Sequence, residues 1–290
     1  MIRVLVVDDS LLIRKVLCEI FAKAPGIEVV GTAEDPFIAR DKIKQLNPDV
    51  VTLDIEMPKM DGITFLKNLM RLKPMPVVMI STLTQKGAPA TLQAMEYGAV
   101  DYVGKPSADQ PELLAEYAQE IIEKVKMASV ANIGRLEQQA NRAPMQVKPA
   151  PRMGKLSNKL IAIGASTGGT EAIRELLLMM PADSPPIVVT QHIPPVFSAS
   201  FAKRLNGIVP MEVHEASDGD KLMAGQVYIA PGDKHLEVIK KGGLLYCRVF
   251  EGERVNLHIP SVEVLFNSVT KNCAKITIGV MLTGMGADGS

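Results

Sequence analysis

A serine flanked by glycines is the residue best placed for nucleophilic chemistry. Residues 160–163 form an apolar run that predicts a buried strand, residues 164–169 are Gly-Ala-Ser-Thr-Gly-Gly, and the apolar positions that follow repeat at helical spacing. Ser166 would therefore lie between a strand and a helix, and Gly164-x-Ser166-x-Gly168 matches a nucleophile elbow. N–H groups at the start of that helix could stabilise an oxyanion. A glycine-rich anion site and a plain structural turn are alternative interpretations.

A serine nucleophile needs a base, and the chain has four histidines. His192 directly follows an apolar run over 187–191, so it would lie at the same sheet edge as Ser166. His214 and His235 fall inside strand-like runs, and His258 follows an alternating run. A base also needs a carboxylate to fix its tautomer, and Asp288 lies in a glycine-rich stretch after the last predicted strand. A turn-forming role for Asp288 is the alternative.

The first 123 residues carry a second group of polar side chains. Five short apolar runs, at 2–7, 27–31, 50–53, 77–80 and 100–103, alternate with amphipathic helical segments and predict a doubly wound parallel sheet. Polar residues at the carboxyl ends of these strands would share one edge: Asp8, Asp9, Asp54, Ser81 and Lys105. Three carboxylates so close together would repel unless a divalent cation lay among them, and oxygen ligands suit Mg²⁺.

Composition limits the classes of protein that this chain can represent. Of its 290 residues 47% are hydrophobic and 22% are charged, with 32 basic and 32 acidic residues. A net charge of zero argues against a nucleic-acid-binding protein. Three scattered cysteines indicate neither a disulfide framework nor a zinc site. No signal peptide and no run of about 18 apolar residues is found, so we expect a cytoplasmic protein without membrane insertion.

The length predicts two domains. Residues 124–157 are rich in lysine, arginine and proline and predict a basic, flexible linker between domains 1–123 and 158–290. The second domain again alternates apolar strands with helices, and two strands around 235–250 predict a hairpin. We therefore expect a second, Rossmann-like α/β domain with a mainly parallel sheet and an antiparallel edge.

The polar residues of the first domain resemble a known family. Asp8-Asp9, Asp54 with Met57-Pro58-x-x-Asp61-Gly62, Ser81 and Lys105-Pro106 are similar to the receiver domain of two-component response regulators, which has a five-stranded flavodoxin-like fold. The resemblance implies phosphorylation of Asp54, with Mg²⁺ held by Asp9, Asp54 and the backbone carbonyl of Glu56, and with Asp8 assisting through water. It also implies that Lys105 pairs with the phosphoryl group, that Ser81 hydrogen-bonds to it and that the Tyr102 ring reports the state.

The second domain resembles the catalytic domain of chemotaxis response regulator protein-glutamate methylesterases. The resemblance lies in residues 164–169, in Gln191-His192 and in the segment 283–289, Thr-Gly-Met-Gly-Ala-Asp-Gly. It implies that Ser166 is the nucleophile, His192 the general base and then acid, and Asp288 the orienting carboxylate. Backbone N–H groups near Thr167 and Met285 would hold the oxyanion.

The combined resemblance implies a phosphorylation-regulated hydrolase of chemotaxis adaptation. Such an enzyme removes methyl esters from chemoreceptor glutamates and deamidates receptor glutamines through an acyl-enzyme, and it is phosphorylated by the chemotaxis histidine kinase. The receiver would cover the active site until Asp54 is phosphorylated, and we expect a monomer. The family continues past position 290, so a C-terminally truncated catalytic domain is expected, and whether this chain is active stays open.

Two other classes make different demands on the sequence. A receiver with a transcriptional output domain needs a basic helix-turn-helix after the linker, and the sequence contains none. A nucleotide-binding oxidoreductase that used residues 164–169 would need an acidic residue at the end of the next strand. Gln191 and His192 are found there instead.

Overall fold

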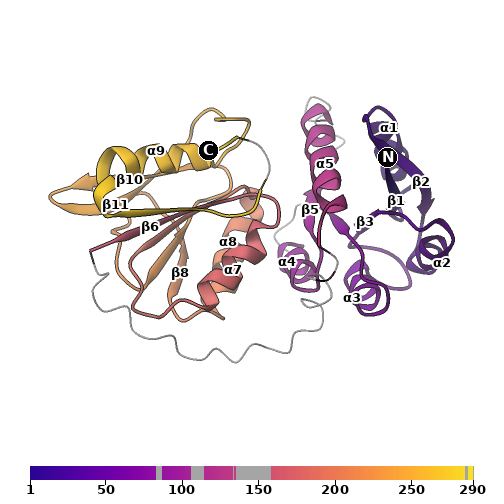
Figure 1. Cartoon of the computed structure of the whole chain (residues 1–290), viewed down its shortest axis with the longest axis horizontal. Helices are drawn as coiled ribbons and strands as arrows, with labels where there is room; N and C mark the ends of the chain where they lie inside the picture. The colour runs from indigo at the N-terminus through magenta and orange to yellow at the C-terminus, as the bar shows by residue number, and fades with distance from the viewer. Residues whose placement is uncertain (83–86, 106–113, 133, 135–157, 285–286, 290) are drawn as a thin grey trace. The chain divides into compact units, whose positions relative to one another are not determined.

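A computed structural model of the 290-residue chain describes residues 1–82, 87–105, 114–132, 134, 158–284 and 287–289. The chain divides into two compact units, Met1–Pro144 and Met145–Ser290, each with its own α/β architecture (Figure 1). Among the described residues, none of the helices has both the length and the apolar character needed to cross a bilayer.

The first unit is a five-stranded parallel sheet with the order β2-β1-β3-β4-β5. Its strands are β1 (Ile2–Val7), β2 (Ile27–Ala33), β3 (Val50–Asp54), β4 (Val77–Ser81) and β5 (Asp101–Gly104). Its helices are α1 (Leu11–Ala22), α2 (Pro36–Leu46), α3 (Gly62–Leu72), α4 (Ala88–Glu96) and α5 (Leu114–Ser129). The order reverses between β1 and β3, which is where ligands bind in doubly wound sheets. The predicted fold of this half is confirmed.

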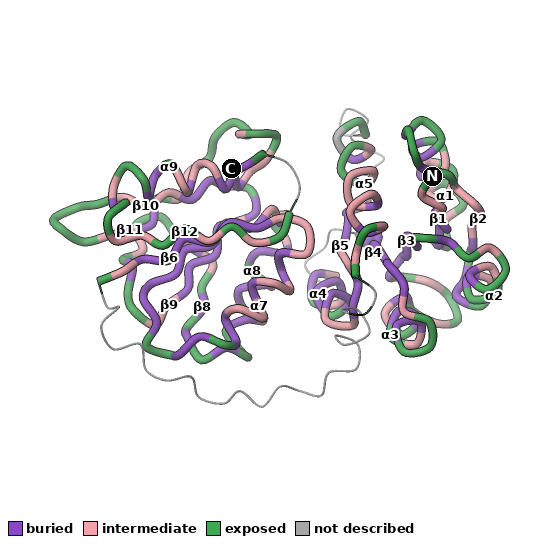
Figure 2. Tube along the Cα trace, in the orientation of Figure 1, coloured by how far each residue is buried: buried purple, intermediate pink, exposed green. Residues whose placement is uncertain are grey.

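Local sequence explains where the helices of this unit begin. Ser10, Asp35 and Asp61 are the N-cap residues of α1, α2 and α3, and the side chain of each accepts a hydrogen bond from the first turn. Pro36 follows its cap at the first helical position, where a missing N–H costs nothing. The strands β3 and β4 are buried throughout, as expected for a sheet covered on both faces (Figure 2).

Helix α5 extends beyond residue 123, the predicted end of the first domain. It continues to Ser129, and Val125 and Ala128 are fully buried in the core of the first unit. The Lys124 ammonium lies 2.9 Å from the Glu120 carboxylate and donates to the Tyr102 carbonyl oxygen at 2.6 Å. A basic residue counted as linker is thus part of a packed helix, and the predicted linker residues 133 and 135–157 lie outside the described residues.

The second unit also contains a five-stranded parallel sheet, with the order β12-β6-β7-β9-β8. Its strands are β6 (Leu160–Ala165), β7 (Ile187–Gln191), β8 (Glu212–Glu215), β9 (Gln226–Ile229), β10 (His235–Lys241), β11 (Leu244–Phe250) and β12 (Thr277–Met281). Its helices are α7 (Gly169–Leu178), α8 (Pro195–Asn206), α9 (Val262–Cys273) and the short 3₁₀ helix η3 (Ala274–Ile276). The predicted hairpin is present, but β10 and β11 form a separate antiparallel sheet.

Helix α9 connects the hairpin to the main sheet of the second unit. The Ser268 hydroxyl accepts from the Val238 N–H at 2.9 Å, and the Asn272 amide donates to the Val238 carbonyl at 2.9 Å. Buried side chains from α9, the hairpin and β6 form one core cluster that includes Leu265, Leu236 and Leu160. Because β6 pairs with β7 on one side and β12 on the other, the segments that follow these three strands leave the sheet at the same edge.

Candidate active site and phosphoacceptor site

Ser166 is the first residue after β6, and its backbone is held from both sides. Its N–H donates to the Thr283 carbonyl at 2.9 Å, and its carbonyl accepts from the Gly169 N–H at 2.7 Å. Gly168 adopts a left-handed conformation with φ of 71°, which glycine allows without a steric penalty. A Cβ on Gly284 would lie 2.6 Å from the Ser166 Cβ, so the chain after β12 approaches the serine as closely as only glycine permits.

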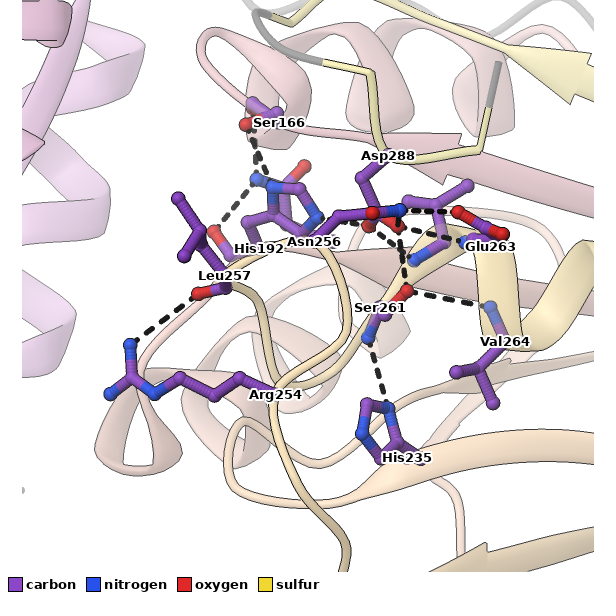
Figure 3. A network of polar contacts seen from close by, with 12 residues as sticks. Ser166, His192, His235, Arg254, Asn256, Leu257, Ser261, Glu263, Val264 and Asp288 are labelled. Atoms are coloured by element: carbon purple, nitrogen blue, oxygen red, sulfur yellow. Dashed lines mark hydrogen bonds and ion pairs between the residues drawn. The ribbon is translucent and has the colours of Figure 1, made fainter.

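The His192 ring lies between Ser166 and Asp288 (Figure 3). Its Nδ1 is 3.0 Å from the Ser166 Oγ, and its Nε2 is 2.8 Å from the Asp288 Oδ2. An ionised carboxylate only accepts hydrogen bonds, so it selects the tautomer with the proton on Nε2. Nδ1 is then free to accept the serine proton. The His258 ring stacks on the His192 ring, with centroids 3.6 Å apart and planes 14° from parallel.

Asp288 is 8% exposed and lies at the N-terminus of α9. Besides His192, its carboxylate accepts from four donors: the Ser261 hydroxyl at 2.6 Å, the Val262 N–H at 2.7 Å, the Glu263 N–H at 3.1 Å and the Asn256 amide at 3.2 Å. Burial alone would raise the pKa of Asp288, but the hydrogen bonds from His192, Ser261 and the helix start hold it well below the usual range. The group is therefore a carboxylate at neutral pH.

A two-residue turn before α9 carries two of these contacts. Val255 and His258 exchange backbone hydrogen bonds at 3.0 and 2.9 Å across Asn256 and Leu257, whose φ angles are 50° and 71°. Two successive left-handed residues are the signature of a type I′ turn. The turn directs the Asn256 amide to Asp288 and places the His258 ring on His192.

The structure brings Ser166, His192 and Asp288 together, although 96 residues separate the last two. Thr167 lies in the turn between β6 and α7, while Met285 lies outside the described residues. The contacts of Asn256, Ser261, His258 and the Gln191 side chain were not predicted from the sequence. Gln191 and residues 257–262 lie in segments that resemble the family, but the contacts of their side chains depend on how a turn and a helix start meet the loop after β12.

The first unit carries a cluster of acidic residues at the carboxyl ends of its strands. One ligand atom each from Asp8, Asp9 and Asp54 lies within 4.8 Å of the others, with Asp8 and Asp54 buried and Asp9 exposed. The Lys105 ammonium lies 2.8 Å from the Asp54 Oδ2 and 3.1 Å from the Asp8 Oδ2. Converging carboxylate oxygens fit a small, hard cation such as Mg²⁺.

Burial sets the electrostatics of this cluster. It raises the pKa of Asp54 to about 6, against the opposing effect of Lys105 and with a further rise from Asp8. Burial also raises the pKa of Asp8. A cation among these carboxylates would relieve the same cost, because it favours the ionised forms.

The other receiver candidates lie on β4, on β5 and just after β3. The Ser81 hydroxyl accepts from the Thr91 hydroxyl of α4 at 2.9 Å and is 2% exposed. Tyr102, on β5, is 3% exposed, and Lys124 lies 5.1 Å from the centre of its ring. Glu56 lies two residues after Asp54 and is exposed.

The two units and their sites define a response regulator with a hydrolase output domain. The family model for the response regulator receiver domain matches residues 4–118, and the model for CheB methylesterase matches residues 161–290. The protein-glutamate methylesterase/protein-glutamine glutaminase 1 of Xanthomonas campestris pv. campestris is 52% identical over 295 residues, which cover 100% of this chain and 82% of that protein.

A second relative, the protein-glutamate methylesterase/protein-glutamine glutaminase of Salmonella typhimurium, is 51% identical over 289 residues and is covered to 82%. The crystal structure of the Thermotoga maritima CheB methylesterase catalytic domain has a TM-score of 0.44 and 39% identity, covering 45% of this chain and 70% of that one. The chain belongs to the protein-glutamate methylesterase/protein-glutamine glutaminase family of chemotaxis hydrolases. Membership of this family excludes the two alternative classes considered from the sequence, a transcriptional regulator and a nucleotide-binding oxidoreductase.

Proposed function

We propose that Ser166, His192 and Asp288 are the catalytic triad of this methylesterase and that the reaction passes through an acyl-enzyme on Ser166. The observation that carries the proposal is the pair of contacts made by one imidazole, at 3.0 Å to the Ser166 hydroxyl and 2.8 Å to the Asp288 carboxylate. A nucleophile, a base and an orienting group in mutual hydrogen-bond reach are what acyl transfer requires.

In the acylation step, Ser166 Oγ attacks the carbonyl carbon of a glutamate γ-methyl ester while His192 Nδ1 takes the hydroxyl proton. The negative charge that develops on the carbonyl oxygen is held by the Thr167 N–H and, by family resemblance, by the N–H of Met285. The C–O bond to the methoxy group then breaks, and His192 returns its proton to release methanol. For a glutamine side chain the leaving group is ammonia.

In the deacylation step, water attacks the acyl ester while His192 again takes a proton. The bond to Ser166 Oγ breaks, His192 returns the proton to the serine, and the product is a glutamate carboxylate. Asp288 keeps the imidazole in the required tautomer and stabilises the imidazolium that forms twice per turnover. Its depressed pKa suits this role, because it remains an anion and does not compete for the proton.

The first unit is proposed to be the regulatory domain, with Asp54 as phosphoacceptor. Asp9, Asp54 and the Glu56 carbonyl would hold Mg²⁺, with Asp8 assisting through water, and when bound the ion neutralises the phosphoryl oxygens. Lys105, which contacts Asp54 at 2.8 Å, would pair with the phosphoryl group. Ser81 would hydrogen-bond to that group, and the Tyr102 ring would report the change.

The proposed partners follow from this chemistry. Methylated chemoreceptors are the substrates, the chemotaxis histidine kinase is the phosphodonor, and no nucleic acid is involved. The protein is proposed to act as a monomer in which the receiver covers the active site until phosphorylation. The segment between α5 and β6 would serve as the linker that permits this movement.

Replacement of the serine tests the proposed chemistry. Ser166→Ala should lower kcat for methanol release from methylated receptor by about 10⁶-fold, because no other group can form the acyl-enzyme. A Ser166→Ala protein that released methanol at close to the wild-type rate would remove Ser166 as the nucleophile.

A further inference from the structure

We propose that Gln191 is a positioning residue of the reaction: its side-chain amide orients the Ser166–Thr167 peptide so that the Thr167 N–H faces the developing oxyanion. The inference rests on the proposed role of Ser166 as nucleophile. It assigns to the residue before the base a task in holding the oxyanion donor.

The Gln191 amide bridges the two chain segments that carry the nucleophile and the base. Gln191 is the last residue of β7, lies opposite Ala165 of β6 in the sheet and is 4% exposed. Its Nε2 donates to the Ser166 carbonyl at 2.9 Å and to the His192 carbonyl at 3.0 Å. The Ser166 carbonyl therefore accepts from two donors, this amide and the Gly169 N–H.

The hydrogen bond from Gln191 to the Ser166 carbonyl also fixes the direction of the Thr167 N–H, because both groups belong to one peptide unit. In a planar trans peptide the C=O and N–H bonds point in opposite directions. Since the Ser166 carbonyl points to the buried Gln191 amide, the Thr167 N–H must point away from it. Thr167 is half-buried, and none of the described residues accepts a backbone hydrogen bond from it. The N–H is thus available to an oxyanion formed next to Ser166.

The Gln191 amide fits in the site only because the neighbouring residue Gly169 has no side chain. A Cβ on Gly169 would lie 2.0 Å from the Gln191 Oε1 and 2.7 Å from the Ala165 Cβ, so only glycine fits at the first position of α7. The Oε1 is buried, and none of the described residues hydrogen-bonds to it. A buried acceptor without a partner is costly, and a flipped amide would instead set Oε1 against two carbonyl oxygens. The unpartnered Oε1 is therefore consistent with a role for the other end of the amide, whose N–H groups donate to the Ser166 and His192 carbonyls.

With a cysteine at position 166, stabilisation of the oxyanion can be measured separately from the reactivity of the nucleophile. In a Ser166→Cys background, acylation by p-nitrophenyl acetate forms a tetrahedral oxyanion before nitrophenolate leaves. Alkylation by iodoacetamide forms a C–S bond as the C–I bond breaks at a saturated carbon, and no oxyanion arises. Adding Gln191→Met, which keeps the shape but removes the donors, should slow acylation by about 10- to 100-fold, because a misdirected donor loses much of its effect. The rate of alkylation should stay unchanged.

The controls use neighbouring residues of the same chain. Thr190→Val replaces a buried hydroxyl on the same strand to which no described residue hydrogen-bonds, and both rates should be unaffected. Ser166→Ala protein, which lacks the nucleophile, reports the background reaction of Cys18, Cys247 and Cys273 with both reagents. If the methionine variant does not fold, Gln191→Leu provides the same comparison, since an aliphatic side chain cannot donate.

Two results would overturn the inference. Equal loss of acylation and alkylation would show that Gln191 holds the nucleophile and base and not the oxyanion donor. No loss in either reaction would show that the amide has no role. Failure of the underlying triad would be seen separately, as continued methanol release by Ser166→Ala.

Discussion

At the scale of single residues, the most constrained group of the second unit is the Asp288 carboxylate. It accepts from the His192 ring and from four further donors, two of which are the first N–H groups of α9. Charge-assisted bonds to an anion are stronger than neutral ones, and a helix N-terminus favours negative charge. The same contacts therefore fix the position of Asp288 and keep it ionised.

Loss of this charge should reduce catalysis without removing the side chain. Asp288→Asn should lower kcat for methanol release by about 10⁴-fold, because the amide no longer selects the tautomer with a free Nδ1. Asp218→Asn is a matched control, since Asp218 also accepts a backbone N–H, from Val249 at 3.0 Å, but does so at the hairpin. Equal rates for the Asp288 variant and the wild type would contradict the orienting role.

The depressed pKa of Asp288 also predicts how stability depends on pH. The folded-state pKa lies below the ordinary value of 3.8, so the carboxylate stabilises the fold fully at pH values above 3.8. As the pH falls below 3.8 toward the folded-state pKa, this contribution is lost. The difference in the free energy of unfolding between wild type and Asp288→Asn, measured by urea titration, should be largest near pH 7 and shrink below about pH 4. A difference independent of pH would contradict the assignment.

Some residues of the site could be predicted from the sequence and others could not. Ser166 and His192 were predictable because each directly follows an apolar strand, and parallel strands bring such positions to one edge. The contact of Asn256 with Asp288 was not predictable from the sequence. It requires two successive left-handed residues, Asn256 and Leu257, and no local sequence pattern indicates that conformation. The Gln191 amide was also missed, because a glutamine at a strand end has no typical chemistry of its own.

At the scale of elements, the N-cap residue of α9, Ser261, contributes both to the stability of the helix and to the position of Asp288. The Ser261 hydroxyl accepts from the Val264 N–H at 3.4 Å and donates to Asp288 at 2.6 Å (Figure 3). The Ser261 N–H in turn donates to the Nδ1 of the buried His235 at 3.2 Å. The start of this helix is therefore fixed from the side of the hairpin and fixes the carboxylate of the site.

Removing the cap should affect both properties. Ser261→Ala should lower the free energy of unfolding by about 1 kcal/mol, the usual cost of losing an N-cap. It should also lower kcat for methanol release, because Asp288 loses a short hydrogen bond. Ser268→Ala, in the same helix, removes a hydroxyl bonded to Val238 and Leu265 and should lower stability alone. Wild-type activity in the Ser261 variant would show that the helix start holds Asp288 without its cap.

Most elements were predictable from apolar periodicity, and the exceptions have physical reasons. The strands β10 and β11 were expected at the edge of the sheet, but α9 packs between them and the main sheet through Leu265 and Val269. The first domain was predicted to end at residue 123 because Lys124 opens a stretch rich in basic residues. Its contacts with Glu120 and Tyr102, which are set by tertiary structure, make it part of the first unit.

At the scale of the whole molecule, two α/β units of similar size carry two kinds of chemistry. One presents carboxylates and a lysine at its strand ends, and the other presents a serine and a histidine at the corresponding edge. Regulation requires that phosphorylation of the first changes the activity of the second. The observable consequence is a ratio of rates, with and without phosphodonor, measured on the full chain.

That ratio depends on Asp54 and on a divalent cation if the proposed regulation is correct. With acetyl phosphate and Mg²⁺ the wild-type chain should release methanol faster than without phosphodonor, and in Asp54→Asn the ratio should be one, because no acyl phosphate can form. Removing Mg²⁺ with EDTA should also give a ratio of one in the wild type. Asp41→Asn, an exposed carboxylate paired with Arg40 on α2, should keep the wild-type ratio. Activation that persists in Asp54→Asn would place the phosphoacceptor elsewhere in the chain.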